Sequence, residues 1–179
     1  QDRPHAREVF RRPMWPFVTA IHVPEVTLSS ERIVQRHLNA MLLGAYLAEI
    51  VDDPVRLKTG AFFEPESGEQ HDRLFSAWLD RQSGERSARI VGAVSRLVVY
   101  SALDGTPPGQ LLSSTGVILE DIGEGWRARL QAQLAGVEGG GENSVAVKAA
   151  QHHLKRLRGE YLLKYLTTER FLPGHGFPT

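Results

Sequence analysis

The chain has 179 residues, of which 41% are hydrophobic and 23% are charged, and its formal net charge at pH 7 is zero. This composition is typical of one globular domain with its own core, and it excludes the disordered and membrane-inserted classes. Any nucleic-acid role must rest on local basic patches, and the absence of cysteine excludes disulfides, thiolate zinc sites and cysteine nucleophiles. We expect a cytoplasmic protein that is not inserted in a membrane.

Residues 1–26 are expected to form an extended arm. Four prolines, at positions 4, 13, 16 and 24, forbid a continuous helix through this segment. The apolar side chains of the arm are Phe10, Met14, Trp15, Phe17 and Ile21. We expect these side chains to act as anchors that lie across another surface.

Residues 27–170 are predicted to fold as a mainly α domain, a single bundle of about five helices. The first helix should begin near Ser29 and Ser30, whose hydroxyls suit a helix N-terminus, and should run to about Val51. Its buried side is predicted to carry Val34, Leu38, Met41, Ala45 and Ala48, and its opposite side Arg32, Gln35, Arg36 and Asn39.

Two further helices are predicted before residue 104. The spacing of Ser67 and Gln70 matches a capping box, and the helix that follows should place Leu74, Phe75, Trp78 and Leu79 on one face. A third helix should begin between residues 83 and 87 and run to about Leu103. Between the first two helices, the runs 55–57 and 61–63 are short enough to pair as a small β-hairpin.

The second half of the domain is predicted to hold two long helices. The first covers about 114–135, with irregularity at Gly123 and Gly125 and with Val117, Ile118, Ile122, Trp126, Leu130 and Leu134 facing inward. A glycine-rich flexible loop should follow at about 136–142. The last helix should span about 144–168, with Val147, Ala150, Leu154, Leu157, Tyr161 and Tyr165 on one face.

The motifs of common catalytic centres are missing from the chain. There is no phosphate-binding P-loop, no dinucleotide-binding glycine motif, no nucleophile elbow and no H-E-x-x-H sequence. His152 and His153 are adjacent, but adjacent positions on a helix point in different directions. The acidic residues are interpreted as solvated surface. We therefore expect no catalytic residue, metal site or cofactor in this chain.

The last predicted helix is locally basic. Between residues 148 and 170, six basic residues stand against two acidic ones, a local excess of four positive charges: Lys148, Lys155, Arg156, Arg158, Lys164 and Arg170 against Glu160 and Glu169. With His152 and His153 these residues form a stripe suited to phosphate contacts. The alternative is a solvated helix face beside an acidic neighbour.

Two weaker basic groups lie earlier in the chain. Arg32 and Arg36 belong to the first helix, and Arg86, Arg89 and Arg96 are spaced to share a face of the third. Either group is able to hold a phosphate backbone. The alternative is that each forms surface ion pairs with the acidic loops, which contribute little to stability.

Two stretches at the ends of the chain resemble a known family. The run 10–16 (FRRPMWP) and the run 26–40 (VTLSSERIVQRHLNA) resemble the region after the last helicase motif of large superfamily-two DNA helicases. In that family a proline-rich aromatic arm leads to a helix with an Arg-His pair and a following Ala, matched here by Arg36, His37 and Ala40. The run 171–179 (FLPGHGFPT) is similar to their Leu-Pro-x-Tyr-Gly-Phe-Pro signature, with His175 in place of the usual Tyr.

The resemblance implies a piece of a larger protein. Within the family the chain is similar to DISARM-type phage-defence helicases, and related genome-maintenance helicases are the alternative. The ATPase lobes would lie upstream and a cysteine-bearing domain downstream of the Gly/Pro-rich segment 171–179, so ATP and Mg²⁺ are expected only in the parent helicase core. This piece would be a non-catalytic accessory domain that bridges the motor and the C-terminal domain. It would contact the backbone of single-stranded DNA. The alternative is a protein-interaction module that docks the helicase onto a partner subunit through the aromatic arm or the glycine-rich loop.

The basic helices and the Arg-His pair together give the candidate nucleic-acid-binding residues. They are Arg32, Arg36, His37, Lys148, His152, Lys155, Arg156 and Arg158. Because such contacts run along phosphates and not base edges, we expect binding that does not depend on base sequence.

Overall fold

The computed structural model describes residues 30–64, 68–82, 88–138 and 145–174, and in these ranges the protein is all α-helical, without a strand. Its elements are α3 (Glu31–Ile50), the 3-10 turn η1 (Pro54–Arg56), α4 (Thr59–Phe63), α5 (His71–Gln82), α6 (Ala88–Val98), α7 (Pro108–Glu138), α8 (Val145–Gly159) and α9 (Leu162–Thr168). The predicted mainly α bundle is confirmed, with seven α-helices in the described ranges instead of about five. The predicted arm, 1–26, lies outside them.

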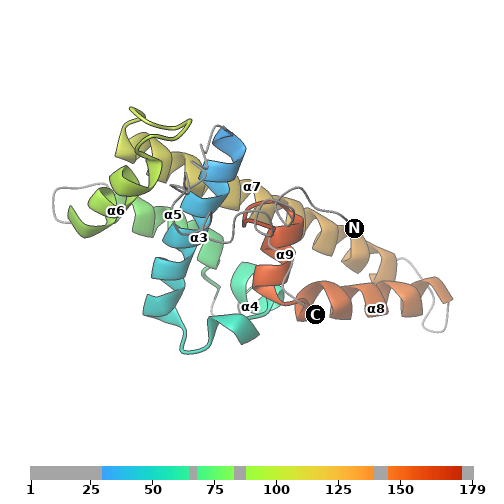
Figure 1. Ribbon diagram of the computed structural model, residues 1–179. Helices are drawn as coiled ribbons and strands as arrows, with labels where there is room; N and C mark the ends of the chain where they lie inside the picture. Colours follow the sequence, from blue (N-terminus) through green and yellow to red (C-terminus); the bar gives the residue numbers. More distant parts are fainter. Residues whose placement is uncertain (1–29, 65–67, 83–87, 139–144, 175–179) are drawn as a thin grey trace, which may run out of the picture.

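The long helix α7 organises the bundle (Figure 1). α5 packs against its first half, where Gly116 and Gly123 of α7 face Ser76 and Asp72 of α5. α8 turns back along the last turns of α7, and α9 lies between α3 and α8. This arrangement leaves one side of α8 free of other described helices.

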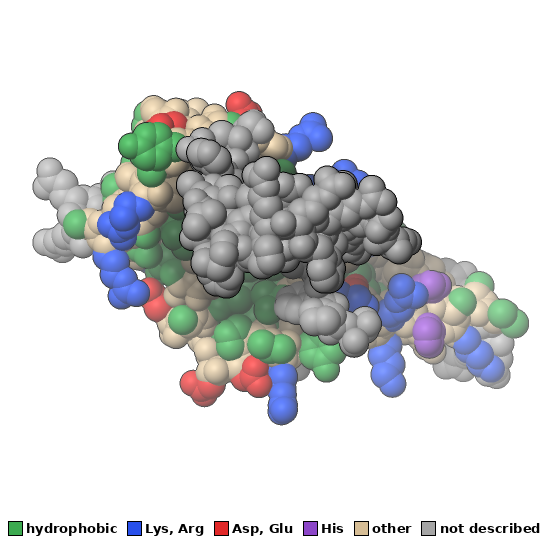
Figure 2. Space-filling view, in the orientation of Figure 1, with side chains coloured by type: hydrophobic (Ala, Val, Ile, Leu, Met, Phe, Trp, Pro, Cys, Tyr) green, Lys and Arg blue, Asp and Glu red, His purple; other side chains and the backbone are tan. Residues whose placement is uncertain are grey.

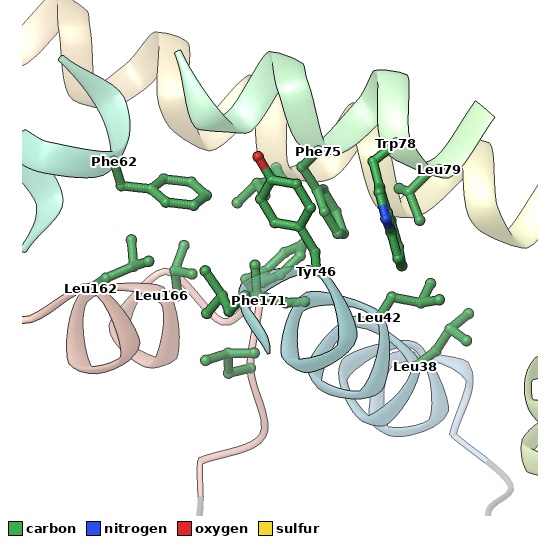
Figure 3. Packing of buried hydrophobic residues seen from close by; sticks show 14 of the residues in the cluster. Leu38, Leu42, Tyr46, Phe62, Phe75, Trp78, Leu79, Leu162, Leu166 and Phe171 are labelled. Atoms are coloured by element: carbon green, nitrogen blue, oxygen red, sulfur yellow. The ribbon is translucent and has the colours of Figure 1, made fainter. Parts of the chain in front are cut away.

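The core lies where α3, α5 and α9 meet (Figure 3). The ring of Tyr46 on α3 packs against Phe75 and Trp78 of α5, with centroid distances of 5.3 and 5.8 Å. Phe62 of α4 and Phe171, just after α9, fill the space beside this aromatic group and are almost fully buried. Burial of large rings from four segments supplies the main driving force for the fold.

The first predicted helix is confirmed as α3, but two residues were assigned to the wrong side. Ala48, predicted on the buried side, is exposed. Asn39 was predicted on the solvent side but is only 1% exposed. Its amide donates to the carbonyl oxygen of Phe171 at 3.0 Å, and its Oδ1 accepts from Gln35 at 2.8 Å and from Thr115 at 3.1 Å. A polar residue is stable in the core when its hydrogen bonds are made, which sequence periodicity does not reveal.

The predicted hairpin of 55–57 with 61–63 is wrong. Residues 54–56 form η1 and residues 59–63 form α4. Phe62 and Phe63 are both fully buried, so neighbouring side chains go into the core on different sides of a short helix. The backbone partner of Lys58 is Tyr161, in an isolated antiparallel bridge. Lys58 therefore pairs with a residue more than a hundred positions away in the chain, and not with the neighbouring run 61–63.

The third predicted helix ends earlier than expected, at Val98 instead of Leu103. Tyr100 has a positive φ of 60°, which takes the backbone out of the helical conformation. The Asp104 carboxylate accepts a hydrogen bond from the Tyr100 N–H at 3.0 Å, and the Ser101 hydroxyl donates to the carbonyl of Val98. These side chains stop the helix although the apolar spacing continues.

α7 is longer and more regular than predicted. It starts at Pro108, a position where proline suits a first helical turn, and it continues through both glycines to Glu138. The first residues of the predicted loop 136–142 are therefore helical, and 139–144 lie outside the described residues. Val117, predicted to face inward, is 55% exposed. No described helix, α7 included, combines the length and the apolar content needed to cross a membrane.

The predicted last helix, 144–168, is two helices. α8 ends at Gly159 and α9 begins at Leu162, with Glu160 and Tyr161 between them. As a result Tyr161, predicted on the buried face, is 49% exposed, while Leu162 is fully buried. The break reorients α9 so that its apolar face reaches the core.

Candidate nucleic-acid interface

A row of exposed basic side chains runs along α8. Lys148, His152 and Lys155 are four and three residues apart and therefore share one side of the helix, and Arg156 adjoins them. We call these four residues the α8 row. None of the four has an ion pair with another residue that the structure describes. Figure 2 shows Lys, Arg and His side chains gathered along this helix.

The α8 row leads into an open hollow of about 610 Å³ where α8 meets α9, which we call the α8 hollow. Its lining is His152, Lys155, Arg156, Gly159, Glu160, Tyr161 and Lys164. Three cationic side chains thus face one carboxylate. Glu160 lies 3.8 Å from the Lys164 ammonium, which is a loose pair for a side chain as exposed as Lys164. The excess positive charge suits a phosphate ligand.

Hydrogen bonds with Leu57, just before α4, and with Thr59, the first residue of α4, fix the α8–α9 junction. The N–H of Thr59 donates to the carbonyl of Glu160 at 3.0 Å, and the N–H of Leu162 donates to the carbonyl of Leu57 at 2.9 Å. The hydroxyl of the fully buried Thr59 donates to the carbonyl of Leu157, near the end of α8. These bonds satisfy groups that a helix end would otherwise leave unpaired, and they hold the hollow in one shape.

Arg158 does not belong to the α8 row. Its guanidinium forms a two-pronged pair with the Glu64 carboxylate, at 2.7 Å from Nε and 2.8 Å from Nη2. The hydrogen bond to Glu64 holds the pKa of Arg158 above its ordinary value. The structure therefore places this predicted phosphate ligand in a link between α8 and the end of α4, with its charge already neutralised.

Two of the three candidate residues of α3, Arg32 and Arg36, line a second hollow. It has a volume of about 520 Å³ and is lined by Glu31, Arg32, Gln35, Arg36, Asn39, Leu103, Ile118 and Arg170. Arg32 and Arg36 meet Arg170 here, so three guanidinium groups face one acidic residue. His37 is half-buried and outside this lining. No residue lines both hollows, so the structure divides the predicted interface into two separate surfaces.

The third basic group does not extend either surface. Arg86 lies outside the described residues, and Arg89 and Arg96 are exposed on α6. In Figure 1, α6 and α8 lie at opposite ends of the bundle. Arg89 and Arg96 are therefore useful as control positions for the α8 row.

The buried titratable groups link helices and do not face either hollow. Asp72 is fully buried and its Oδ2 lies 2.9 Å from Nη1 of Arg127, which joins α5 to α7. Burial raises the pKa of the Asp72 carboxyl, and the Arg127 guanidinium opposes this. Burial also lowers the pKa of His71, whose Nδ1 lies 3.1 Å from the Tyr46 hydroxyl, and raises the pKa of Tyr46 to about 12.

Metal ligands are not gathered in the described part of the chain, where no group of three or more His, Cys, Asp or Glu residues is placed to hold an ion. The His152 and His153 rings, 6.2 Å apart and nearly perpendicular, lie on the exposed side of α8. Their exposure and their place beside Lys155 fit a cationic surface better than a metal centre.

Sequence reasoning missed two side chains of the α8 hollow region, Lys58 and Tyr161. The Lys58 ammonium lies over the Tyr161 ring, 2.9 Å from its centroid, which is a cation–π arrangement. Lys58 gave no signal because the bridge that brings it to Tyr161 is non-local. For Tyr161 the signal was Gly159, a residue that favours a helix end and that allows the break two positions before the ring.

The comparisons with known proteins give no relative for this chain. No family model, no curated protein and no solved structure matches it.

Proposed function

We propose that this chain is a non-catalytic domain that binds the backbone of nucleic acid through α8. The observation that carries the proposal is the α8 row, four exposed basic side chains without acidic partners among the described residues, ending in the α8 hollow. A phosphate that meets Lys155 or Arg156 releases condensed counterions, which drives binding at low salt. Such contacts read no base edges, so the binding is independent of sequence.

We further propose that the parent protein is an ATP-dependent DNA helicase and that this domain guides a single strand beside its motor. Support comes from the sequence resemblance of the runs 10–16, 26–40 and 171–179 to superfamily-two helicases. ATP and Mg²⁺ would then act in the parent's motor lobes. The domain would bridge those lobes and the C-terminal domain while the α8 row holds phosphates.

Fluorescence anisotropy with a labelled single-stranded oligonucleotide tests the proposal. We expect micromolar affinity that falls as salt rises from about 50 to about 300 mM. The double substitution Lys155→Ala/Arg156→Ala should weaken binding and reduce the slope of log K against log salt by about 1.4, because each lost phosphate contact of a single strand accounts for roughly 0.7.

A control variant with the same change in charge separates a local contact from a general loss of positive charge. Arg89→Ala/Arg96→Ala removes two exposed cations from α6, at the other end of the bundle. This variant should keep the wild-type salt slope. Absence of binding at low salt, or equal losses in both double variants, would refute a specific role for the α8 row.

A protein-interaction module is the second candidate, and an apolar hollow favours it. This hollow has a volume of about 590 Å³ and is lined by Ala40, Leu43, Gly44, Leu47, Pro54, Leu163, Lys164, Thr167, Thr168, Leu172 and Pro173. Gly44 is exposed and a Cβ there would meet no atom within 4 Å, so we use Gly44→Glu to place a charge in the hollow and check by circular dichroism that the variant is folded. Loss of binding to a partner subunit of the parent helicase in a pull-down with this variant, with nucleic-acid binding unchanged, would support the second candidate.

A further inference from the structure

An aromatic ring stands in the α8 hollow. Tyr161 is 49% exposed, although Leu162 beside it is fully buried. Its hollow is otherwise lined by polar and cationic side chains, Lys155, Arg156 and Lys164 among them. A half-exposed ring with phosphate-binding groups around it is the combination found where proteins bind single strands.

The ring is held in place from two directions. The backbone at Tyr161 is fixed by the bridge to Lys58 and by the hydrogen bonds on either side of it, from Thr59 to Glu160 and from Leu162 to Leu57. The ammonium of Lys58 lies over one face of the ring, 2.9 Å from its centroid. A ring that is already ordered loses little conformational entropy when a flat partner stacks on it.

We propose that Tyr161 is a stacking platform for one base of a single-stranded nucleic acid whose phosphates lie along the α8 row. This inference rests on the proposed function and adds a contact with a base to the contacts with phosphates. From Lys148 to Gly159 the axis of α8 rises by about 16 Å, so the row and the ring follow one another along a short stretch of strand. The two faces of the Tyr161 ring then have different partners. The Lys58 ammonium covers one face, and the base stacks on the other.

Stacking on Tyr161 selects for single strands because the bases of a duplex are already stacked on one another. An unpaired base has a free π-face, and any of the four bases can use it, so the platform carries no sequence preference. Glu160 beside the ring repels phosphate, which favours a base over a phosphate at this point of the hollow. The phosphates then lie nearer to Lys155 and Arg156.

The test measures the affinity of the intact chain and its variants for an oligo-dT strand and for a duplex of the same length, by anisotropy at constant low salt. Tyr161→Ala should bind the single strand roughly 5- to 150-fold more weakly, the range that loss of one stacked base produces, and should bind the duplex as the wild type does. Tyr161→Phe keeps the ring and should retain wild-type affinity. Thermal melting followed by circular dichroism checks that each variant is folded.

An abasic strand separates stacking from phosphate contact, because it keeps the charges and lacks the bases. The wild type should bind it as weakly as Tyr161→Ala binds oligo-dT, and Tyr161→Ala should bind both strands alike. Wild-type single-strand affinity in Tyr161→Ala, or an equal loss for strand and duplex, would overturn the platform while the salt-dependent binding through Lys155 and Arg156 stands. Failure of the wild type to bind any nucleic acid would instead overturn the proposed function.

Discussion

Gly123 is a position where α7 has no room for a side chain. A Cβ built there would lie 1.9 Å from Oδ2 of the buried Asp72, which is in turn 2.9 Å from the Arg127 guanidinium. The close approach of α5 to α7 therefore depends on this glycine. The ion pair also depends on it, because a displaced Asp72 would leave a buried charge without its partner, and such a charge is costly.

We predict that Gly123→Ala lowers the free energy of unfolding by about 1–3 kcal/mol, the usual cost of forcing extra atoms into a packed site. Urea denaturation followed by circular dichroism measures it. Gly125→Ala is the matched control: its Cβ would meet nothing closer than Arg129 Nη2 at 3.8 Å, so the better helix propensity of alanine should raise stability by about 0.5–1 kcal/mol. Equal effects of the two substitutions would contradict the packing argument.

The packing of α4 against α8 removes the charge of Arg158 from the binding surface. Gly60 of α4 comes so close to α8 that a Cβ there would lie 3.1 Å from the backbone oxygen of Arg158. This contact brings Glu64, just after α4, within reach of the Arg158 guanidinium. The helix face that the sequence predicts as one basic stripe is therefore divided into the α8 row and a structural pair.

We predict that Glu64→Gln and Arg158→Ala each lower the free energy of unfolding by less than about 1 kcal/mol, because both side chains are more than a third exposed and solvent screens their charges. Arg158→Ala should leave the salt slope of single-strand binding unchanged. The same urea and anisotropy measurements check both expectations. A drop in salt slope equal to that of a row residue would show that Arg158 leaves Glu64 to contact phosphate.

Residues that follow the last helix complete the core of the bundle. Phe171 is 1% exposed and lies among side chains of α3 and α9, and its carbonyl oxygen accepts the amide hydrogen bond of Asn39 (Figure 3). Leu172 is also buried. The first two residues of the predicted Gly/Pro-rich segment thus contribute to the core of the helical domain.

We predict that Phe171→Ala lowers the free energy of unfolding by about 3–5 kcal/mol, since it removes a large ring from a packed core. Phe171→Leu, which keeps most of the apolar volume, should cost clearly less. Urea denaturation of both variants measures the difference. A loss below about 1 kcal/mol for Phe171→Ala would mean that the bundle is complete before residue 171.

The sequence predicts the helices of this bundle better than it predicts their ends. Spacing of Val34 and Leu38, and of Phe75 and Trp78, places α3 and α5 because burial of a repeating apolar face is a local property of the chain. The end of α6 at Val98 and the break at Gly159 depend on side-chain and backbone hydrogen bonds. Local turn chemistry sets the first of these, and contacts with residues 57–59 set the second.

By itself the sequence determined the mainly helical class, the position of most helices and the basic character of residues 148–156, because composition and periodicity carry these properties. Only the tertiary structure decided which charges remain available. It paired Arg158 with Glu64, separated Arg32 and Arg36 from the α8 row, and turned Tyr161 outward beside Lys58. Each of these outcomes depends on residues far apart in the chain, and periodicity holds no information about such partners.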